Sequence, residues 1–195
     1  NTPLHIAMQM ENLDAVKQLL SHNADIFALN NMGKAPIHIV FDKGIDFLNK
    51  VMTNGIINAV DAKGNTPLFY AVETDKAAII KRLIESGAKI DARNKNGRTP
   101  LHAAVISGNA TAARVLLEAG SNVAAQDSLG NTCTHFITER YSIDMADLLI
   151  EYKAPIEVRN TEGIAPIHSA IRQKNVQIVQ GLLELGASTS ISDVR

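Results

Sequence analysis

Histidine and cysteine side chains are the first candidates for chemistry in this sequence. The chain contains six histidines and a single cysteine, Cys133. Side chains of these two types can bind a metal ion or act as an acid, a base or a nucleophile. Five of the histidines recur at the end of a short motif, as His5, His38, His102, His135 and His168. What they can do therefore depends on the elements that carry this motif.

The motif recurs at a nearly constant spacing. It reads TPLH at 2–5, APIH at 35–38, TPLF at 66–69, TPLH at 99–102, TCTH at 132–135 and APIH at 165–168. Successive starts are 33, 31, 33, 33 and 33 residues apart. A fixed period of this length indicates an array of repeats, each forming one supersecondary unit. The repeats cover about 1–32, 33–63, 64–96, 97–129, 130–162 and 163–195.

The fourth repeat shows most clearly how one unit is built. Residues 94–97, Asn-Lys-Asn-Gly, are a turn signal. Thr99 can cap a helix, and Pro100 suits the first helical position because its missing N–H needs no partner there. Apolar spacing then predicts one short helix over 100–107 and a second over 111–119. Each repeat is therefore expected to run helix, turn, helix, loop.

Helix pairs this short cannot bury their apolar faces alone. Stacked neighbours bury a continuous core instead, so the sequence predicts an all-α chain that forms one domain over residues 1–195, without a linker. Hydrophobic residues make up 46 % of the chain, tryptophan is absent and aromatic residues contribute only 4 %. The core is therefore expected to be aliphatic.

The repeat geometry argues against a metal site. Packed helices lie roughly 8–10 Å apart. Zinc requires its nitrogen ligands within about 2.0–2.1 Å of the ion. One histidine per repeat cannot converge on one ion, so we expect the motif histidines to hold the loop and the helix start by hydrogen bonds. No metal ligand and no cofactor are predicted.

Catalysis is equally poorly supported. Cys133 and His135 are a nominal nucleophile and base, but both occupy motif positions and no third orienting group accompanies them. The glycines recur singly rather than as a phosphate-binding loop. The sequence therefore predicts no catalytic residues and a protein that is not an enzyme.

Charge limits the partners. The chain has 19 basic and 20 acidic residues, for a net charge of −1, which argues against nucleic acid or an anionic membrane surface. No apolar run approaches the roughly 20 residues that span a bilayer, so no direct membrane insertion is expected. A single cysteine suits a reducing compartment, and we expect a cytoplasmic location.

The complete pattern resembles the ankyrin repeat. It consists of an Asx turn with a glycine three residues later, the T-P-L-H motif, an inter-helix glycine and a V-x-x-L-L second helix. The resemblance implies an ankyrin-repeat solenoid of stacked helix-turn-helix units with β-hairpin loops, or fingers. It also implies a non-enzymatic scaffold that binds a partner peptide or domain on a concave surface of fingers and first helices. The alternative is an architectural spacer or spring in a larger channel, toxin or effector, contacting mainly its own chain.

The resemblance further implies that recognition uses the variable positions of the fingers and the first-helix ends. Three of them, Met32, Leu129 and Ile164, are apolar where exposure to solvent is expected, and Arg93 and Arg98 are the strongest polar candidates because arginine is enriched in binding hot spots. The partner-binding candidates are Met32, Lys34, Lys63, Arg93, Lys95, Arg98, Ile106, Leu129, Arg140, Ile164 and Arg172.

Two repeats depart from the pattern. The second is two residues short, with the deletion placed near residues 53–55, and the fifth has Cys133 and Thr134 in place of the Pro-Leu pair. We expect these two repeats to be the less stable ones. The first and last repeats have the apolar pattern of internal repeats rather than the polar outer face of a cap, which predicts flanking ankyrin repeats in the parent chain.

Overall fold

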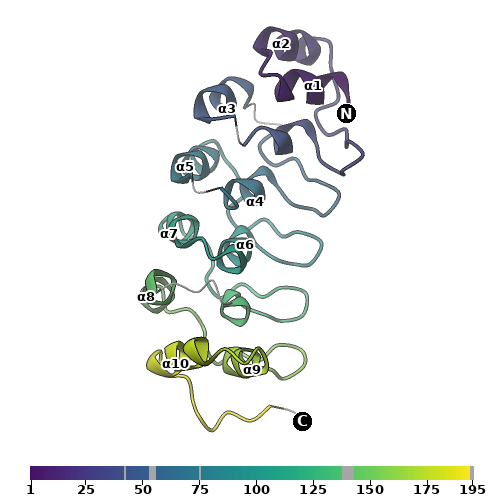
Figure 1. Ribbon diagram of the computed structural model, residues 1–195. Coiled ribbons are helices and arrows are strands. Elements are labelled where there is room, and N and C mark those ends of the chain that lie inside the picture. The colour runs from purple at the N-terminus through teal and green to yellow at the C-terminus, as the bar shows by residue number, and fades with distance from the viewer. Residues whose placement is uncertain (42, 53–55, 75, 138–142, 194–195) are drawn as a thin grey trace. The chain divides into compact units, whose positions relative to one another are not determined.

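The described part of the chain is helical. The computed structural model describes every residue except 42, 53–55, 75, 138–142 and 194–195 (Figure 1). Within the described residues there are ten α-helices and two short 3-10 helices, labelled η, and no strand. The chain divides into two compact units, residues 1–95 and 96–195. The expectation of a single domain stays a prediction.

The first unit contains three helix pairs. They are α1 (Pro3–Gln9) with α2 (Leu13–Ser21), η1 (Pro36–Ile39) with α3 (Ile45–Val51), and α4 (Pro67–Ala71) with α5 (Ala77–Glu85). The first element of each pair stacks on the first element of the next, and α2 packs on α3. Loops project on the side of the first helices, away from the second helices (Figure 1).

The second unit repeats this arrangement. Its pairs are α6 (Pro100–Ser107) with α7 (Ala110–Glu118), η2 (Cys133–Phe136) with α8 (Ile143–Glu151), and α9 (Pro166–Arg172) with α10 (Val176–Glu184). Here η2 packs on both α6 and α9, and α7 packs on α8. The predicted helix over 100–107 is confirmed, and the one predicted over 111–119 lies one residue earlier.

Local side-chain chemistry starts these helices. The Thr2 side chain accepts from the His5 amide at the start of α1, and Pro3 occupies the first helical position. Asparagine caps three of the second helices by accepting a backbone N–H three residues on, as Asn12, Asn109 and Asn175. The expected helix start after the motif threonine is therefore confirmed.

The second and fifth repeats are the irregular ones. Each has only a single 3-10 turn where the other repeats have a first α-helix. Branched side chains contribute to this difference, since Ile37, Ile39 and Val40 follow Pro36 in the second repeat and stiff β-branched residues disfavour helix. The predicted deletion near 53–55 lies outside the described residues. The lower stability expected of these repeats stays a prediction.

An aliphatic core fills each unit, as the composition predicts. Fully buried side chains include Leu4, Ile37, Leu68 and Leu83 in the first unit and Leu101, Leu116, Met145 and Leu148 in the second. No helix in the described part of the chain has both the length and the apolar character needed to cross a bilayer.

Candidate protein-binding surface

The loops between repeats form tight fingers, which we define as residues 30–34, 61–65, 127–131 and 160–164. In the second of these, one carboxylate oxygen of Asp61 accepts the amides of Lys63 at 2.8 Å and Asn65 at 2.7 Å. A backbone bond from Asp61 N–H to the Asn65 carbonyl closes the turn at 3.0 Å. The β-hairpins implied by the family resemblance are thus hairpin-shaped turns, with no strand among the described residues. The turn is too short to form the ladder of backbone hydrogen bonds that defines a pair of β-strands.

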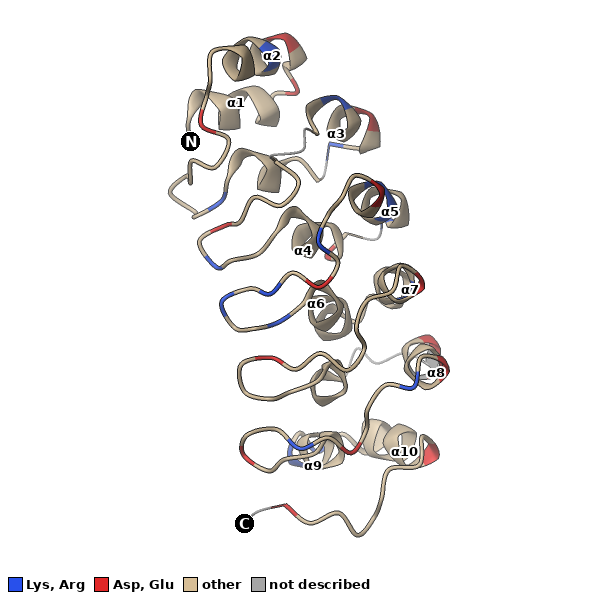
Figure 2. Cartoon of the chain, turned by 180° about the vertical axis from the view of Figure 1, so that it is seen from behind, with Lys and Arg blue, Asp and Glu red and all other residues tan. Residues whose placement is uncertain are grey.

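This geometry places exposed residues at the turn of each finger. The residues that donate the first of the two amides to the Asx side chain are all exposed: Met32, Lys63, Leu129 and Glu162. Because the Asx side chain fixes the backbone of the turn, these residues form finger tips whose backbone position is defined. Both basic and acidic residues occur along the fingers (Figure 2).

Adjacent fingers are bonded to one another through their backbones. The Ala62 N–H donates to the Gly33 carbonyl at 2.8 Å, and the Thr161 N–H donates to the Leu129 carbonyl at 2.9 Å. Gly130 has a φ of +76°, and a Cβ there would lie 3.1 Å from the Thr161 nitrogen. The finger glycine is therefore required both by conformation and by the approach of the next finger.

The motif histidines have the structural role expected from the sequence. In His5, Nδ1 accepts the Thr2 backbone N–H at 3.1 Å, so Nε2 carries the proton and donates to the Lys34 carbonyl at 2.8 Å. His135 does the same with Thr132 N–H and the Ile164 carbonyl. Both ring nitrogens are thus used to join a helix start to the next finger.

Burial keeps these groups unreactive. Burial lowers the pKa of His38 and of His135 below the ordinary 6.5, although the carbonyls of Asn65 and Ile164 oppose the shift. Burial also raises the pKa of the Cys133 thiol to about 12, and this thiol lies 3.6 Å from the Val123 carbonyl. Cys133 and His135 therefore do not form a nucleophile and base.

Most of the predicted binding residues are exposed. Met32 keeps 71 % of its surface in solvent and Leu129 keeps 56 %, which confirms the expected exposure of both. Lys63, Arg93, Lys95 and Arg172 are exposed, and Ile106 is half-buried. Arg172 also donates to the Asp193 carboxylate at 3.2 Å. Arg140 lies outside the described residues.

The expected exposure of Ile164 is wrong, because its side chain is only 7 % exposed. Ile164 stands at the base of a finger, where its N–H donates to Asn160 and its carbonyl accepts from His135. Lys34 and Arg98 occupy the same position in other repeats. Their long side chains carry a charge beyond the covered stem, whereas the isoleucine ends within it.

Lys34 and Arg98 both reach across to an aromatic ring of the following repeat. The Lys34 ammonium lies 4.7 Å from the Tyr70 ring centroid, and the Arg98 guanidinium carbon lies 4.4 Å from that of Phe136. Arg98 Nε is also 3.6 Å from the buried carboxylate of Asp127. These two cations therefore help join repeats, a role that the sequence did not reveal.

The buried finger carboxylates remain ionised. For Asp127, burial would raise the pKa, but bonds from the Asn131 and Leu129 amides and the Arg98 charge hold it below the ordinary value. For Asp61, burial is likewise outweighed, first by the Tyr70 hydroxyl, which donates to it at 2.7 Å. The pKa of Tyr70 is raised by its burial and by this bond.

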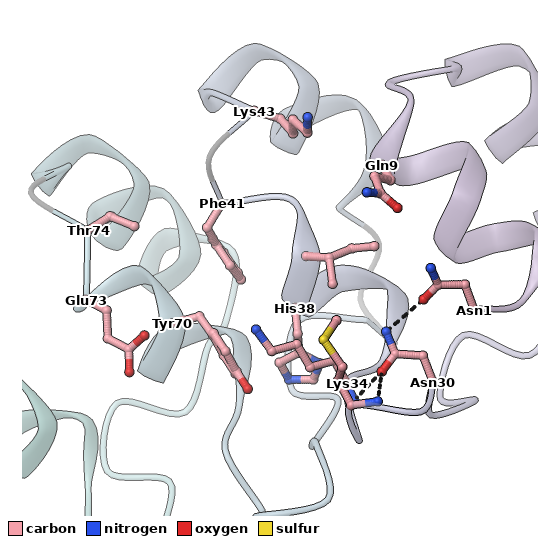
Figure 3. Close-up of a pocket in the computed structure, with 12 residues that line it drawn as sticks. Asn1, Gln9, Asn30, Lys34, His38, Phe41, Lys43, Tyr70, Glu73 and Thr74 are labelled. Atoms are coloured by element: carbon pink, nitrogen blue, oxygen red, sulfur yellow. Dashed lines mark hydrogen bonds between the residues drawn. The ribbon is translucent and has the colours of Figure 1, made fainter.

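One groove in the first unit combines finger and first-helix residues of three repeats (Figure 3). Its volume is about 520 Å³. Two of the predicted residues, Met32 and Lys34, line it. The other lining residues are Asn1, Gln9, Asn30, His38, Ile39, Phe41, Lys43, Tyr70, Glu73 and Thr74. Tyr70 was not among the binding residues predicted from the sequence. It directly follows the motif residue Phe69, and this adjacency is the sequence signal that could have identified it as a groove residue.

Apolar surface is also exposed at the outer faces of the first and last repeats. A second groove of about 540 Å³ lies on the first repeat, lined mainly by Pro3, Ile6, Ala7, Met10, Ala15 and Leu19. Leu19 is half-buried, whereas the equivalent Leu83 and Leu149 are fully buried by a neighbouring repeat. On the last repeat, Ile171 is 56 % exposed, whereas the equivalent Met8 is fully buried.

Comparison with known proteins agrees with this architecture. The chain is 29 % identical over 93 residues to neurogenic locus notch homolog protein 1 of Homo sapiens, and 29 % identical over 91 residues to the human homolog 2. The matches cover 46 % and 45 % of this chain and 4 % of each relative. The chain therefore corresponds to a small part of the length of these relatives.

A solved structure shows the same fold over nearly the whole chain. It is the crystal structure of the ankyrin repeat domain of Bcl-3, described as a unique member of the IkappaB protein family, with a TM-score of 0.81 and 26 % identity. The similarity covers 99 % of this chain and 90 % of that one. The ankyrin repeat profiles match residues 1–31, 40–127 and 119–193. With most of its length matched, this chain belongs to the ankyrin repeat family.

Proposed function

We propose that this chain is a protein-binding module that engages its partner through the finger tips and the adjoining first helices. Ankyrin repeats are a general protein–protein interaction fold, and they are non-enzymatic. What supports the finer proposal is the exposure of Met32 and Leu129 at rigid finger tips. Because the backbone that carries these large apolar side chains is already held in place, little backbone freedom is lost when a partner covers them.

The cations favoured by sequence contribute differently to this surface. Arg98 contacts the Asp127 carboxylate and the Phe136 ring, so replacing it would disturb the fold as well as any binding site. Lys63 at a finger tip and Lys95 in the loop before the fourth motif are both exposed and are better polar candidates. A partner with acidic groups would suit them, at the modest energy of exposed ion pairs.

Site-specific photocrosslinking tests this proposal. A benzophenone amino acid replaces Met32 or Leu129 at the finger tips, or Lys17 or Thr111 on the exposed face of α2 or α7 as matched controls. We expect the same protein to be crosslinked in cells from both finger tips and from neither control. Equal crosslinking from all four positions, or crosslinks only from Lys17 and Thr111, would contradict it.

We infer a second candidate function from the apolar outer faces. A chain whose end repeats expose Met10 and Ile171 suits an architectural segment stacked between further ankyrin repeats of its parent. Hydrogen exchange of α1 and α10, compared between this chain and the complete parent protein, tests this. Slower exchange in the parent is expected if repeats cover these faces, and identical exchange would argue against it.

A further inference from the structure

The groove in the first unit has an apolar part that faces solvent. Met32 lines it from a finger with 71 % of its surface exposed, and half-buried Ile39 and Tyr70 line it as well. The Phe41 and Tyr70 rings stack nearly parallel, with centroids 6.3 Å apart and an angle of 7° between them. This gives the groove a rigid aromatic wall beside an adaptable methionine, a combination that accepts a large apolar side chain.

The groove also has a basic part. The Lys34 ammonium lies 4.7 Å from the Tyr70 centroid and forms no ion pair with any carboxylate in the described ranges of the chain. Lys43, also in the lining, lies 4.0 Å from Glu11. The Asp61 carboxylate stays ionised and accepts the Tyr70 hydroxyl and two finger amides, but it forms no ion pair with Lys34.

An acidic residue lies on the opposite side of the aromatic wall. Glu73 is exposed and points to one side of Tyr70, whereas Lys34 lies on the other side (Figure 3). A carboxylate of a ligand is therefore attracted to the Lys34 side and repelled from the Glu73 side. The groove thus imposes a direction on a bound chain.

We propose that this groove binds an extended segment of a partner protein that carries an acidic residue beside a large apolar one. The apolar side chain lies against Met32 and Tyr70, and the carboxylate faces Lys34. The volume of about 520 Å³ suits a few side chains rather than a whole domain. This assignment rests on the proposed protein-binding function and names the chemistry of the ligand.

Selection from a phage-displayed library of random peptides tests this chemistry. The complete chain is immobilised, and enriched sequences are read. We expect enriched peptides to share Asp or Glu close to Leu, Met or Phe. A fluorescein-labelled peptide of the consensus sequence then serves as the probe for affinity measurements by fluorescence anisotropy.

Four variants locate the binding site. Lys34→Met keeps the aliphatic stem over Tyr70 and removes the charge, and we expect affinity to fall about tenfold, which corresponds to about 1.4 kcal/mol. Met32→Ser removes the apolar contact and is expected to weaken binding by a similar factor. Lys34→Arg restores the charge and should restore affinity. Lys17→Met on α2 removes an equal charge away from the groove and should leave affinity unchanged.

The outcomes separate this proposal from the broader function. Enriched peptides without an acidic residue, or with affinity unchanged in Lys34→Met and Met32→Ser, overturn the groove assignment. A library that yields no binder also overturns it. In each case crosslinking from Leu129, which lies in the other unit, decides independently whether the finger tips bind a protein.

Discussion

Thr66 and Phe69 occupy the positions at which Thr99 and His102 are joined by a 2.9 Å hydrogen bond, and the Thr66 hydroxyl lies buried without a partner. Phenylalanine packs where the imidazole would be, with 5 % of its surface exposed, but it has no nitrogen to receive the hydroxyl proton. A buried polar group left unsatisfied costs about 1–3 kcal/mol. The third repeat therefore contains an unsatisfied buried hydroxyl, which becomes evident when its motif is compared with that of the fourth repeat.

Replacing that hydroxyl should stabilise the protein. Thr66→Val keeps the side-chain shape and removes the unsatisfied group, and we expect the free energy of unfolding to rise by about 1 kcal/mol. The matched change Thr99→Val removes a satisfied hydroxyl and leaves His102 without this partner, so it should lower the free energy by about 1 kcal/mol. Urea denaturation of both variants measures the difference. Equal effects of the two changes would contradict this account.

Loss of the Arg98 charge should weaken the second unit. Arg98→Met retains the stem but leaves the Asp127 carboxylate, whose side chain is only 2 % exposed, without this cation and removes the contact with Phe136. We expect a loss of about 1–2 kcal/mol in the free energy of unfolding. The control is Lys95→Met, at an exposed position, with an expected change within about 0.5 kcal/mol. Thermal unfolding followed by circular dichroism compares them, and equal melting temperatures would refute the role of Arg98.

Lys153 is held in a conformation that suits glycine. Its φ is +51°, and it ends α8 at the position where Gly87, Gly120 and Gly186 end other second helices with φ near +90°. Lys153→Gly should raise the free energy of unfolding by about 1 kcal/mol, because relief of left-handed strain exceeds the added freedom of the unfolded chain. Lys153→Ala provides the control, since alanine keeps the strain. Chemical denaturation that finds the alanine variant as stable as the glycine variant would exclude the strain.

Mild acid should destabilise the protein through its buried histidines. The pKa of His38 and of His135 is lower in the folded state than the ordinary 6.5. At a pH between the folded and the unfolded pKa, the unfolded chain binds more protons than the folded one. The contribution of these histidines to the free energy of unfolding is therefore complete above about pH 6.5 and is lost as the pH falls below it. Urea titrations at neutral pH and in mild acid measure the loss.

The control for this pH dependence replaces the histidine itself. His38→Gln keeps hydrogen-bonding capacity without a group that titrates near neutrality, so its stability should fall less steeply over the same range, whatever its starting value. An unchanged slope would show that His38 does not contribute. At more acidic pH, below about 3.8, the carboxylates of Asp61 and Asp127 should add a second loss, because their folded pKa values are depressed.

Sequence periodicity predicted the repeats, the helix order and the role of the histidines. The Asx position of the finger turns is occupied along the chain, and this too was evident. The structure shows that asparagine and aspartate differ there. The Asn160 amide donates to Asn131 of the preceding finger at 2.8 Å, whereas Asp127 accepts from Asn131 of its own finger. A charged acceptor cannot donate, so the two residue types link fingers differently.

The wrong prediction that Ile164 is exposed shows what the sequence period cannot predict. Exposure of Met32 and Leu129 follows from the turn, because the Asx side chain holds the backbone amide of each and the amide two residues later, which fixes the backbone there. The burial of Ile164 depends on how a finger base sits against its neighbours. In the same way, Lys34 and Arg98 were recognised as variable and basic, but nothing in their spacing shows that an aromatic ring of the next repeat lies beneath them.

By itself, the sequence determined the repeat, the positions of most of its helices, its aliphatic core and the absence of a motif for catalysis. These depend on local signals, namely turn residues, caps and apolar spacing, that act within one period of the chain. Only the tertiary structure decided which variable residues meet across repeats and which side chains join one repeat to the next. It also decided that Met32, Lys34 and Tyr70 line one groove. Those properties depend on side chains about 29 to 38 residues apart in sequence, at contacts where the shape of each neighbour, and not the period, sets the outcome.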